Sequence, residues 1–488
     1  MEYDTVIGLE THVQLKTRSK MWCGCPNTFG AEPNTLVCPV CLGMPGVLPV
    51  ANEEALRLTV LTGFLLNCEI PESAKFDRKN YFYPDSAKNY QVTQYDRPST
   101  RNGWMEFEFS GASGHESGLA RVRITRAHLE EDVGKNNHFE RHSGVDFNRA
   151  GVPLLEIVSE PDLTGPDMAH AYLRALTDIL VRGGISDCDL EKGMVRCDVN
   201  LSVRPKGDPN LGAKIELKNL NSFSAVRRAI HFESARQIGE IERGGTLRQE
   251  TRRWDDEAGI TEPMRSKEDA HDYRYFPEPD LMPFRPTPEW LAEVRSRMPE
   301  LPLARKQRLM RDYGLPAGDA AVLSDRLDLG RFFEQAASGV ANPKAVANWV
   351  INNLPAQLAA RGIGLEGLPF GPDALRELVV LVDSGRISSK IAQDVFVEMT
   401  ASGGRPEAIV TARGWAQVSD MAEIERLADQ VIAAHPGPAA DFRNGKAAAL
   451  NFLKGQLMKL SRGKANPALA GDVLERKLGG VANSGSIP

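Results

Sequence analysis

Four cysteines near the N-terminus constrain the fold of this chain more than any other feature of the sequence. They form two pairs, Cys23-Gly24-Cys25 and Cys38-Pro39-Val40-Cys41, with twelve residues between the pairs. Such spacing is typical of a small zinc loop, in which four thiolates fill the coordination shell and leave no position for a substrate. We therefore predict a structural zinc site at residues 23–41. The competing interpretation is four reduced cysteines without a common ligand.

The segment before the cysteines has the pattern of a half-buried strand. Glu10, His12 and Gln14 alternate with mostly apolar residues between Ile7 and Leu15, which matches the two-residue period of a strand. One face would enter a core, while the other would present a carboxylate, an imidazole and an amide side by side. This polar face predicts a second metal site with a role different from that of the zinc loop.

The same alternation returns at residues 121–126, 195–204 and 214–218, and helical patterns lie near 167–180 and 223–243. The turn-like residues 207–210 predict an antiparallel hairpin that has Lys214, Glu216 and Lys218 on its polar face. We expect an α+β fold whose antiparallel sheet has one apolar and one densely charged face.

The second half of the chain has a different pattern. At 488 residues the chain is too long for one core. Prolines cluster between Pro277 and Pro302, the strand patterns stop there, and helical spacing follows, as in 373–382 and 388–400. We predict a catalytic cradle domain at 1–290, a helical domain at 291–402 and a C-terminal helical tail domain at 403–488.

Composition narrows the functional class. The formal net charge of −6 does not suggest a general nucleic-acid coat protein, although a local basic patch remains compatible with it. No apolar run approaches the ~20 residues of a membrane span, and the acidic first residues lead directly into the first strand pattern. We expect a cytoplasmic protein without membrane association, in a reducing milieu where clustered cysteines bind metal.

Acidic residues on the predicted polar faces suit magnesium, which takes one or two carboxylates and leaves its other positions to water and phosphates. The candidates, together with His12, are Glu10, Glu130, Glu131, Asp132, Glu156, Glu160 and Asp198. For each residue alone, the competing interpretation is an ordinary solvated acid.

Basic residues accompany these acids, as phosphoryl transfer requires. They are Lys79, Lys88, Arg196, Arg204, Lys214, Lys218 and Arg274. The sequence has neither standard glycine-rich nucleotide loop. A second basic group, in a tail segment without acids, would meet RNA phosphates or form a solvated helix face; it contains Lys446, Lys454, Lys459, Arg462 and Lys464.

Motifs along nearly the whole chain resemble those of the B subunits of the aspartyl/glutamyl-tRNA amidotransferases. The resemblance begins with Val6-Ile7-Gly8-Leu9-Glu10-Thr11-His12 and with the cysteine segments 23–25 and 37–43. It continues in the segments 29–35, 78–85, 128–132, 148–160, 196–200, 216–222, 272–280, 454–458 and 463–467. Residues 285–330 match least.

The resemblance implies an N-terminal domain similar in fold to glutamine synthetase. It implies that the chain uses ATP and magnesium to convert the side-chain carboxylate of a misacylated Asp-tRNA(Asn) or Glu-tRNA(Gln) to an acyl phosphate. Ammonia that the glutaminase, or A, subunit releases from glutamine would then attack, and a C subunit would complete the enzyme. Because the chain has no amidase loop of its own, glutamine hydrolysis should come from another chain.

The resemblance also implies residue roles. Glu10, His12 and Glu131 would bind magnesium near the activated carboxylate, with Glu130 adjacent. Lys79 and Lys88 would line the ammonia route, and the C-terminal helices would bind tRNA. Our own inference adds Arg196, Asp198, Lys218 and Arg274 as residues of the ATP phosphate site.

Two other functional classes compete with this interpretation. The chain would be a non-catalytic tRNA-binding adaptor if only the zinc loop and basic tail mattered. It would be an ATP-dependent amide ligase if its substrate were a free amino acid. The acid-rich strand faces argue against the adaptor, and the basic tail argues against the free-substrate ligase.

Overall fold

The chain divides into two compact units, Met1–Leu303 and Ala304–Pro488, in a computed structural model. The structure describes residues 1–110, 117–264, 273–415, 421–461 and 465–479. Each unit has hydrophobic cores of its own.

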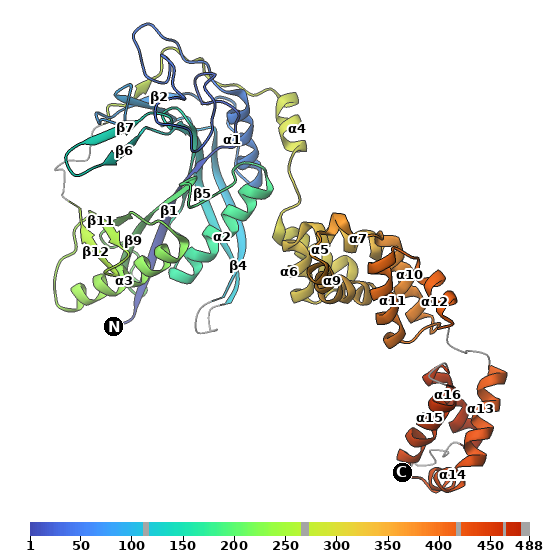
Figure 1. Ribbon diagram of the computed structural model, residues 1–488. Helices are drawn as coiled ribbons and strands as arrows, with labels where there is room; N and C mark the ends of the chain where they lie inside the picture. The colour runs from blue at the N-terminus through green and yellow to red at the C-terminus, as the bar shows by residue number, and fades with distance from the viewer. Residues whose placement is uncertain (111–116, 265–272, 416–420, 462–464, 480–488) are drawn as a thin grey trace. The chain divides into compact units, whose positions relative to one another are not determined.

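The first unit combines strands with four helices (Figure 1). Its strands are β1 (Tyr3–Gln14), β2 (Asp77–Asn80), β3 (Tyr90–Thr93), β4 (Thr100–Ser110), β5 (Ser117–Glu131), β6 (Lys135–His138), β7 (Ser143–Asp146), β8 (Pro153–Ser159), β9 (Val195–Pro205), β10 (Ile215–Lys218), β11 (Glu250–Asp255), β12 (Ile260–Pro263) and β13 (Phe276–Pro277). Its helices are α1 (Glu53–Leu65), α2 (Pro166–Arg182), α3 (Phe223–Glu242) and α4 (Pro288–Ser296).

Eight of these strands form one sheet in the order β12-β11-β10-β9-β1-β8-β5-β4. Neighbouring strands are antiparallel except β10 and β11, which are parallel. Strand β1 lies near the centre, where His12 is opposite Glu156 of β8 and Arg196 of β9. Two smaller sheets, β13-β2-β3 and β6-β7, complete the unit.

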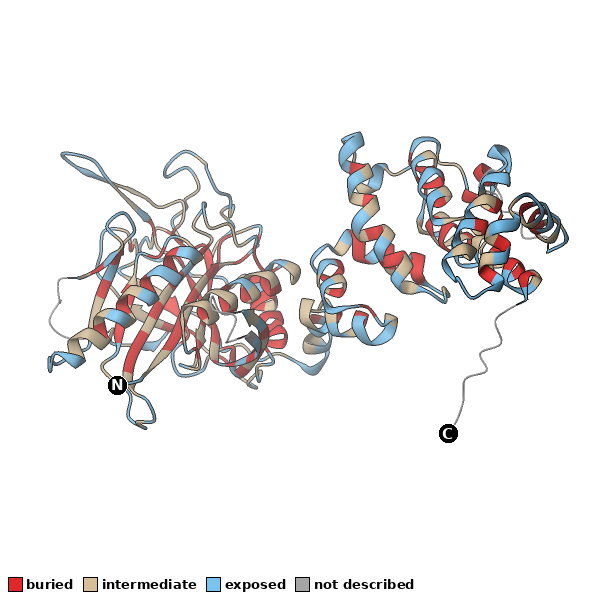
Figure 2. Ribbon diagram, turned by 90° about the horizontal axis from the view of Figure 1, so that it is seen from below, coloured by how far each residue is buried: buried red, intermediate tan, exposed pale blue. Residues whose placement is uncertain are grey.

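The two faces of the large sheet differ as the sequence alternation predicts. On β1 the side chains of Ile7, Leu9 and Val13 are fully buried, whereas Glu10 and His12 are only partly buried. Helix α2 packs on β4, α3 packs on β9, and α1 packs on β5, so these helices cover the apolar face (Figures 1 and 2). The polar face remains on the side that β2, β6 and β7 occupy in Figure 1.

The second unit is helical. Its elements are α5 (Pro302–Tyr313), α6 (Ala317–Asp325), α7 (Leu327–Ala337), α8 (Pro343–Asn348), the π-helix η1 (Trp349–Asn353), α9 (Leu354–Arg361), the short η2 (Leu365–Gly367), α10 (Pro372–Asp383), α11 (Ser389–Ser402), α12 (Pro406–Arg413), α13 (Met421–Ala434), α14 (Pro436–Arg443), α15 (Ala448–Leu460) and α16 (Pro467–Leu478). Two separate hydrophobic cores stabilise it. One is formed by residues from Leu309 to Val410, and the other by residues from Ile424 to Leu478.

The α+β class is confirmed: a predominantly antiparallel sheet domain that carries the cysteines is followed by helices. The predicted β9–β10 pairing is also confirmed, since Leu217 is opposite Val199 in antiparallel register. The domain limits at 290 and 402 stay predictions. Ile409 and Val410 lie beyond the second limit but belong to the first helical core.

Within the part of the chain that the structure describes, no helix combines the length and the apolar character that crossing a membrane requires.

Candidate functional site

One imidazole and two carboxylates meet on the polar face of the large sheet. The Nε2 atom of His12 lies 3.4 Å from Oε2 of Glu156 and 3.8 Å from Oε1 of Glu130. Strand register explains this meeting, because His12 and Glu156 are opposite each other and Glu156 is in turn opposite His128, two residues before Glu130. One ligand atom from each of His12, Glu130 and Glu156 lies within 4.8 Å of the others, as one metal ion requires.

The pKa values of this group are those expected of buried acids that bind a cation. Burial, with the adjacent charge of Glu156, raises the pKa of Glu130 to about 7. Burial also raises the pKa of Glu156, but the imidazoles of His128 and His12 outweigh it and lower that pKa below its ordinary range. Burial lowers the pKa of His128 to about 4. Ionisation of Glu130 in this buried position therefore costs free energy, and a bound divalent cation would offset that cost.

A second set of charges lies across β1, on β9 and β10. Asn200 donates from Nδ2 to Glu10 (2.7 Å), and Lys218 donates to Asp198 (2.7 Å). Burial lowers the pKa of Lys218, but Asp198 and Glu216 raise it above its ordinary value. Among the described residues, the buried Oδ1 atom of Asn200 has no hydrogen-bond partner. A buried acceptor without a partner is costly in a finished core, so this oxygen fits a site that receives a ligand.

Arg196 connects these two sets. It donates to Oδ1 of Asp132 (3.0 Å), and Asp132 also accepts from Gln14 (3.0 Å). The charge of Asp132 raises the pKa of Arg196. The side chain of Arg196 is 43% exposed while that of Asp132 is 2% exposed, so Arg196 is held by a buried carboxylate and is still accessible to an anionic ligand.

Lys79, on β2, is a cation on which the charges of the acidic group act. Burial lowers its pKa, but the charges of Glu130 and Glu156 raise it above its ordinary value. Its ammonium lies 4.9 Å from the ring centre of Tyr273. Lys79 thus lies between the acids and an aromatic cluster.

Lys88 pairs with Glu131. The Lys88 ammonium donates to Oε1 of Glu131, which also accepts from the backbone N–H of Val92 (2.9 Å). Both partners are largely buried, with side chains 12% and 4% exposed. Since consecutive strand residues point to opposite faces, Glu131 has these partners while Glu130 faces His12.

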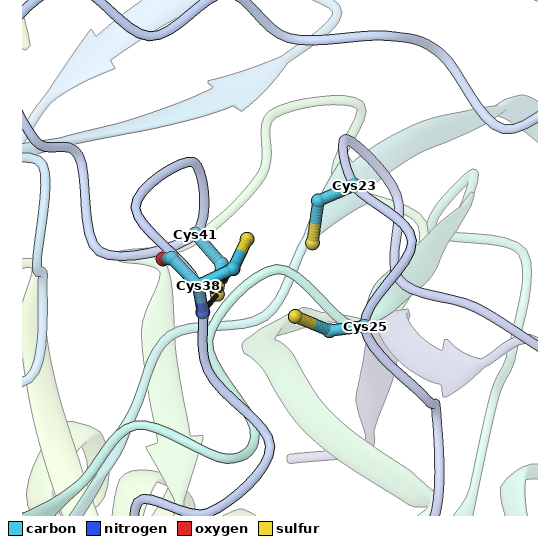
Figure 3. A group of neighbouring side chains, drawn as sticks. All are labelled: Cys23, Cys25, Cys38 and Cys41. Carbon is cyan, nitrogen blue, oxygen red and sulfur yellow. Dashed lines mark hydrogen bonds between the residues drawn. The ribbon is translucent and has the colours of Figure 1, made fainter.

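The four cysteines form a separate cluster. Their sulfur atoms lie within 4.8 Å of one another, and Figure 3 shows Cys23 and Cys25 pointing toward the Cys38–Cys41 turn. The N–H of Cys38 donates to Sγ of Cys41 (3.2 Å), and the fully buried Lys20 has its Nζ 3.7 Å from the same sulfur. A hydrogen bond from Cys23, together with Lys20, lowers the pKa of Cys41 to about 4. This donor set fits a closed tetrahedral zinc site.

Comparison with known proteins identifies the family. The model of the GatB/GatE catalytic domain matches residues 5–292, and that of the GatB domain matches residues 331–478. The chain belongs to the GatB family. The family resemblance inferred from the sequence motifs is therefore confirmed.

Relatives in the GatB family extend over nearly the full chain. The B subunit of the aspartyl/glutamyl-tRNA(Asn/Gln) amidotransferase of Carboxydothermus hydrogenoformans is 51% identical over 482 residues, covering 98% of this chain and 99% of the relative. The protein of the same name from Caldanaerobacter subterraneus is 50% identical over 480 residues, covering 98% and 100%. The one from Moorella thermoacetica is 48% identical over 482 residues, again covering 98% and 100%.

The structure divides the predicted magnesium set among three places. His12 lies with Glu130 and Glu156, Glu10 lies with Asn200, and Glu131 pairs with Lys88. Arg196, Asp198 and Lys218 lie on β9 and β10 beside Glu10, whereas Arg274 precedes β13, with its guanidinium 5.5 Å from the ring centre of Phe82. The individual roles of these residues stay proposals.

The predicted tRNA-binding residues lie in the second unit. Lys446 pairs with Asp441 (2.9 Å), Lys454 is on the side of α15 that approaches Gly471, and Lys459 is exposed. Arg462 and Lys464 lie outside the described residues.

An aromatic surface that the strand and cysteine patterns do not predict lies on β2, β3 and β13 and the residues next to them. Phe82, Tyr83, Tyr95 and Phe276 are exposed large side chains near β2, β3 and β13. Tyr95 stacks on Tyr275, with ring centres 4.2 Å apart. The sequence signal is the grouping of basic and aromatic residues at 78–83 and 273–276, a composition that is typical of nucleic-acid-binding surfaces.

The pKa of Glu130 predicts a pH effect on stability when magnesium is withheld. A carboxyl whose folded pKa is raised to about 7 stabilises the fold fully below its unfolded pKa and loses that contribution as pH rises through 7. The side chain of Glu130→Gln stays neutral. As pH rises from 5 to 8, the variant should therefore melt at an increasingly higher temperature than wild type, by roughly 2–4 °C for each kcal/mol of unfolding free energy that wild type loses.

The measurement is thermal unfolding of both proteins at several pH values in magnesium-free buffer without a chelator, so that the cysteine site keeps its metal. Titrations common to both proteins cancel in the difference. Equal pH dependence in wild type and variant would contradict the raised pKa.

Proposed function

We propose that this chain catalyses the ATP-dependent amidation of Asp-tRNA(Asn), Glu-tRNA(Gln) or both, as the B subunit of a heterotrimeric amidotransferase. The observation that carries this proposal is the group of His12, Glu130 and Glu156, whose buried carboxylates lie within reach of one ion and are surrounded by cations. The relatives, which are named as B subunits of an aspartyl/glutamyl-tRNA(Asn/Gln) amidotransferase, support the same substrate class.

His12, Glu130 and Glu156 would hold the metal. Magnesium, when bound there, would neutralise phosphate oxygens and polarise the phosphoryl group that is transferred. The separation of the two carboxylate pKa values matches this role, since Glu156 stays ionised while Glu130 is ready to lose its proton to a cation. Glu10 on β1 and Asp198, opposite it on β9, would complete the charge balance of the site.

Arg196 and Lys218 would bind and orient the phosphates. Each is held at one end by a carboxylate, at 3.0 Å for Arg196 and 2.7 Å for Lys218, so that little side-chain entropy is lost when a ligand binds. Arg274, beside the ring of Phe82, is a further candidate. Transfer of the γ-phosphoryl group to the substrate carboxylate releases ADP and leaves an acyl phosphate, whose phosphate then leaves when ammonia attacks the carbonyl carbon.

Ammonia would reach the acyl phosphate past Lys88 and Lys79. Lys88 with Glu131 offers a buried polar pair, and Lys79 lies close enough to Glu130 and Glu156 for their charges to raise its pKa. A polar route through otherwise apolar surroundings can hold ammonia by hydrogen bonds and exclude bulk water. We propose that the A subunit releases this ammonia from glutamine and that the enzyme also contains a C subunit.

RNA binding has two supports in this chain. Exposed rings near the acids, among them Phe82 and Tyr95, offer stacking surfaces to the bases of a single-stranded RNA end. The lysines of α15 and its flanking segments would meet tRNA phosphates, which should make affinity fall with rising salt.

A reconstituted assay separates the proposal from its alternatives. The chain is purified with the A and C subunits of the enzyme and is supplied with ATP, magnesium, glutamine and misacylated tRNA. We expect amidated aminoacyl-tRNA together with ADP. Binding of tRNA without ATP turnover would identify an adaptor, and turnover with free glutamate in place of charged tRNA would identify a free-substrate ligase.

A further inference from the structure

The turn that carries two of the cysteines ends in direct contact with Lys88. Hydrogen bonds from Leu42 to Cys38 (3.1 Å), from Gly43 to Val40 (3.0 Å) and from Met44 to Pro39 (2.9 Å) define the turn. Gly43 closes it with φ of +65°, and a Cβ built there would lie 2.5 Å from Cγ and 3.0 Å from Cα of Lys88. The backbone of Gly43 therefore packs on Lys88 at a distance that no other residue type allows.

The cysteine cluster also lies near Glu131, the partner of Lys88, with Gly151 between them. A Cβ built on Gly151 would lie 3.5 Å from Cβ of Cys41, 3.6 Å from Cδ of Lys20 and 3.9 Å from Oε2 of Glu131. One glycine thus separates a cysteine of the cluster from the carboxylate that Lys88 binds. The backbone N–H of Gly151 donates to the carbonyl of Asp132 (2.9 Å), which ties this contact to the end of β5.

Lys20 packs between the cysteine turn and the residues that precede β8. Its side chain is fully buried, and its Nζ lies 3.7 Å from Sγ of Cys41 and 3.3 Å from the carbonyl oxygen of Phe147. Its Cδ lies 3.6 Å from the position that a Cβ on Gly151 would take, so Lys20 contacts both sides of the approach between the cluster and Glu131.

We propose that the cysteine-bound metal positions Lys88 against Glu131, so that metal occupancy controls ammonia delivery as well as loop stability. A metal bound by the four cysteines, whose side chains Figure 3 shows, would join Cys23 and Cys25 to Cys38 and Cys41 and would hold the turn so that Gly43 packs on Lys88. Gly43 is the positioning residue. The inference rests on the proposed function only in that Lys88 lies on the ammonia route.

The matched pair Gly43→Ala and Gly46→Ala tests this contact. Both glycines have positive φ, +65° and +85°, in the same loop, but a Cβ on Gly46 would meet nothing within 4 Å. Backbone strain is therefore common to both variants, and only Gly43→Ala displaces Lys88. Each variant is assayed as the full complex, with either glutamine or ammonium chloride as nitrogen donor.

We expect Gly43→Ala to retain its cysteine-bound metal and to lose glutamine-driven amidation by up to about 10²-fold, the cost of a displacement of about 1 Å. Ammonium-driven amidation, which supplies ammonia from solution, should fall much less, and Gly46→Ala should resemble wild type with both donors. In a Lys88→Met background, Gly43→Ala should cause no further loss. Equal losses with both donors, or losses that multiply in the double variant, would overturn the inference.

A chemical measurement tests the positioning without using activity. The complex is acylated with limiting amine reagent, with and without its cysteine-bound metal, and labelling of Lys88 is compared by peptide mass spectrometry with that of Lys135, an exposed lysine on β6. Metal removal and Gly43→Ala should each raise the relative labelling of Lys88 several-fold. If Lys88 labels equally in all states, the metal does not position it. If wild type shows no ATP-dependent amidation with either donor, the proposed function fails instead.

Discussion

His12→Ala should lower ATP-dependent amidation by about 10²–10³-fold, the usual loss when one preorganised group that stabilises developing charge is removed. The imidazole lies 3.4 Å from Glu156 and 3.8 Å from Glu130, so its removal deprives a metal of a ligand and leaves two neighbouring carboxylates without their nearest neutralising group. Glutamine hydrolysis should remain, because the proposed function assigns that step to the A subunit. The measurement is amidated tRNA and glutamate released, in the same reaction mixture.

His138→Ala is the matched control for this loss. His138 is exposed on β6, where Nδ1 lies 2.8 Å from Oγ of Ser143, and its removal should leave both reactions unchanged. Unaltered amidation by His12→Ala at saturating magnesium would exclude His12 from the site. A parallel fall in melting temperature would show that the loss came from unfolding.

Cys38→Ser should release the cysteine-bound metal and lower the free energy of unfolding by about 4 kcal/mol or more, a size that accompanies loss of a structural metal. Residues 27–50 contain neither helix nor strand, so a bound metal would add a link between the two cysteine segments that no helix or strand supplies. The substitution also removes a sulfur 3.9 Å from Sγ of Cys41, the atom that lies 3.7 Å from the buried Nζ of Lys20. Metal content by mass spectrometry and thermal unfolding measure the two effects.

Cys188→Ser provides the comparison for Cys38→Ser. Cys188 lies outside the cluster and its N–H donates to the hydroxyl of Ser186 (3.1 Å), so serine there should keep the metal and nearly all of the stability. Should Cys38→Ser retain stoichiometric metal and the wild-type melting temperature, the cysteines would have no structural role.

Alternation alone predicted which side of each strand is buried. On β9 the hydrophobic core contains the side chains of Val195, Val199 and Leu201, whereas Asp198 and Asn200 lie on the opposite face. The reason is that successive side chains of a strand point to opposite sides. Local spacing was equally sufficient for the cysteine cluster, since both pairs lie within twenty residues and their loop needs no distant partner. The motifs also led to the family, which the full-length relatives confirm.

Only the tertiary structure decided which acids meet. The sheet order places β8 between β1 and β5, so Glu156 joins His12 and Glu130, whereas Glu131, next to Glu130 in sequence, turns to Lys88. Strand periodicity gives the face of a residue but not its cross-strand neighbour, which depends on packing between segments far apart in the chain. The contact of Gly43 with Lys88 and the aromatic surface near Phe82 arise for the same reason. The sequence therefore determined the cysteine cluster and the polar strand faces, and the order of the strands determined which acids meet.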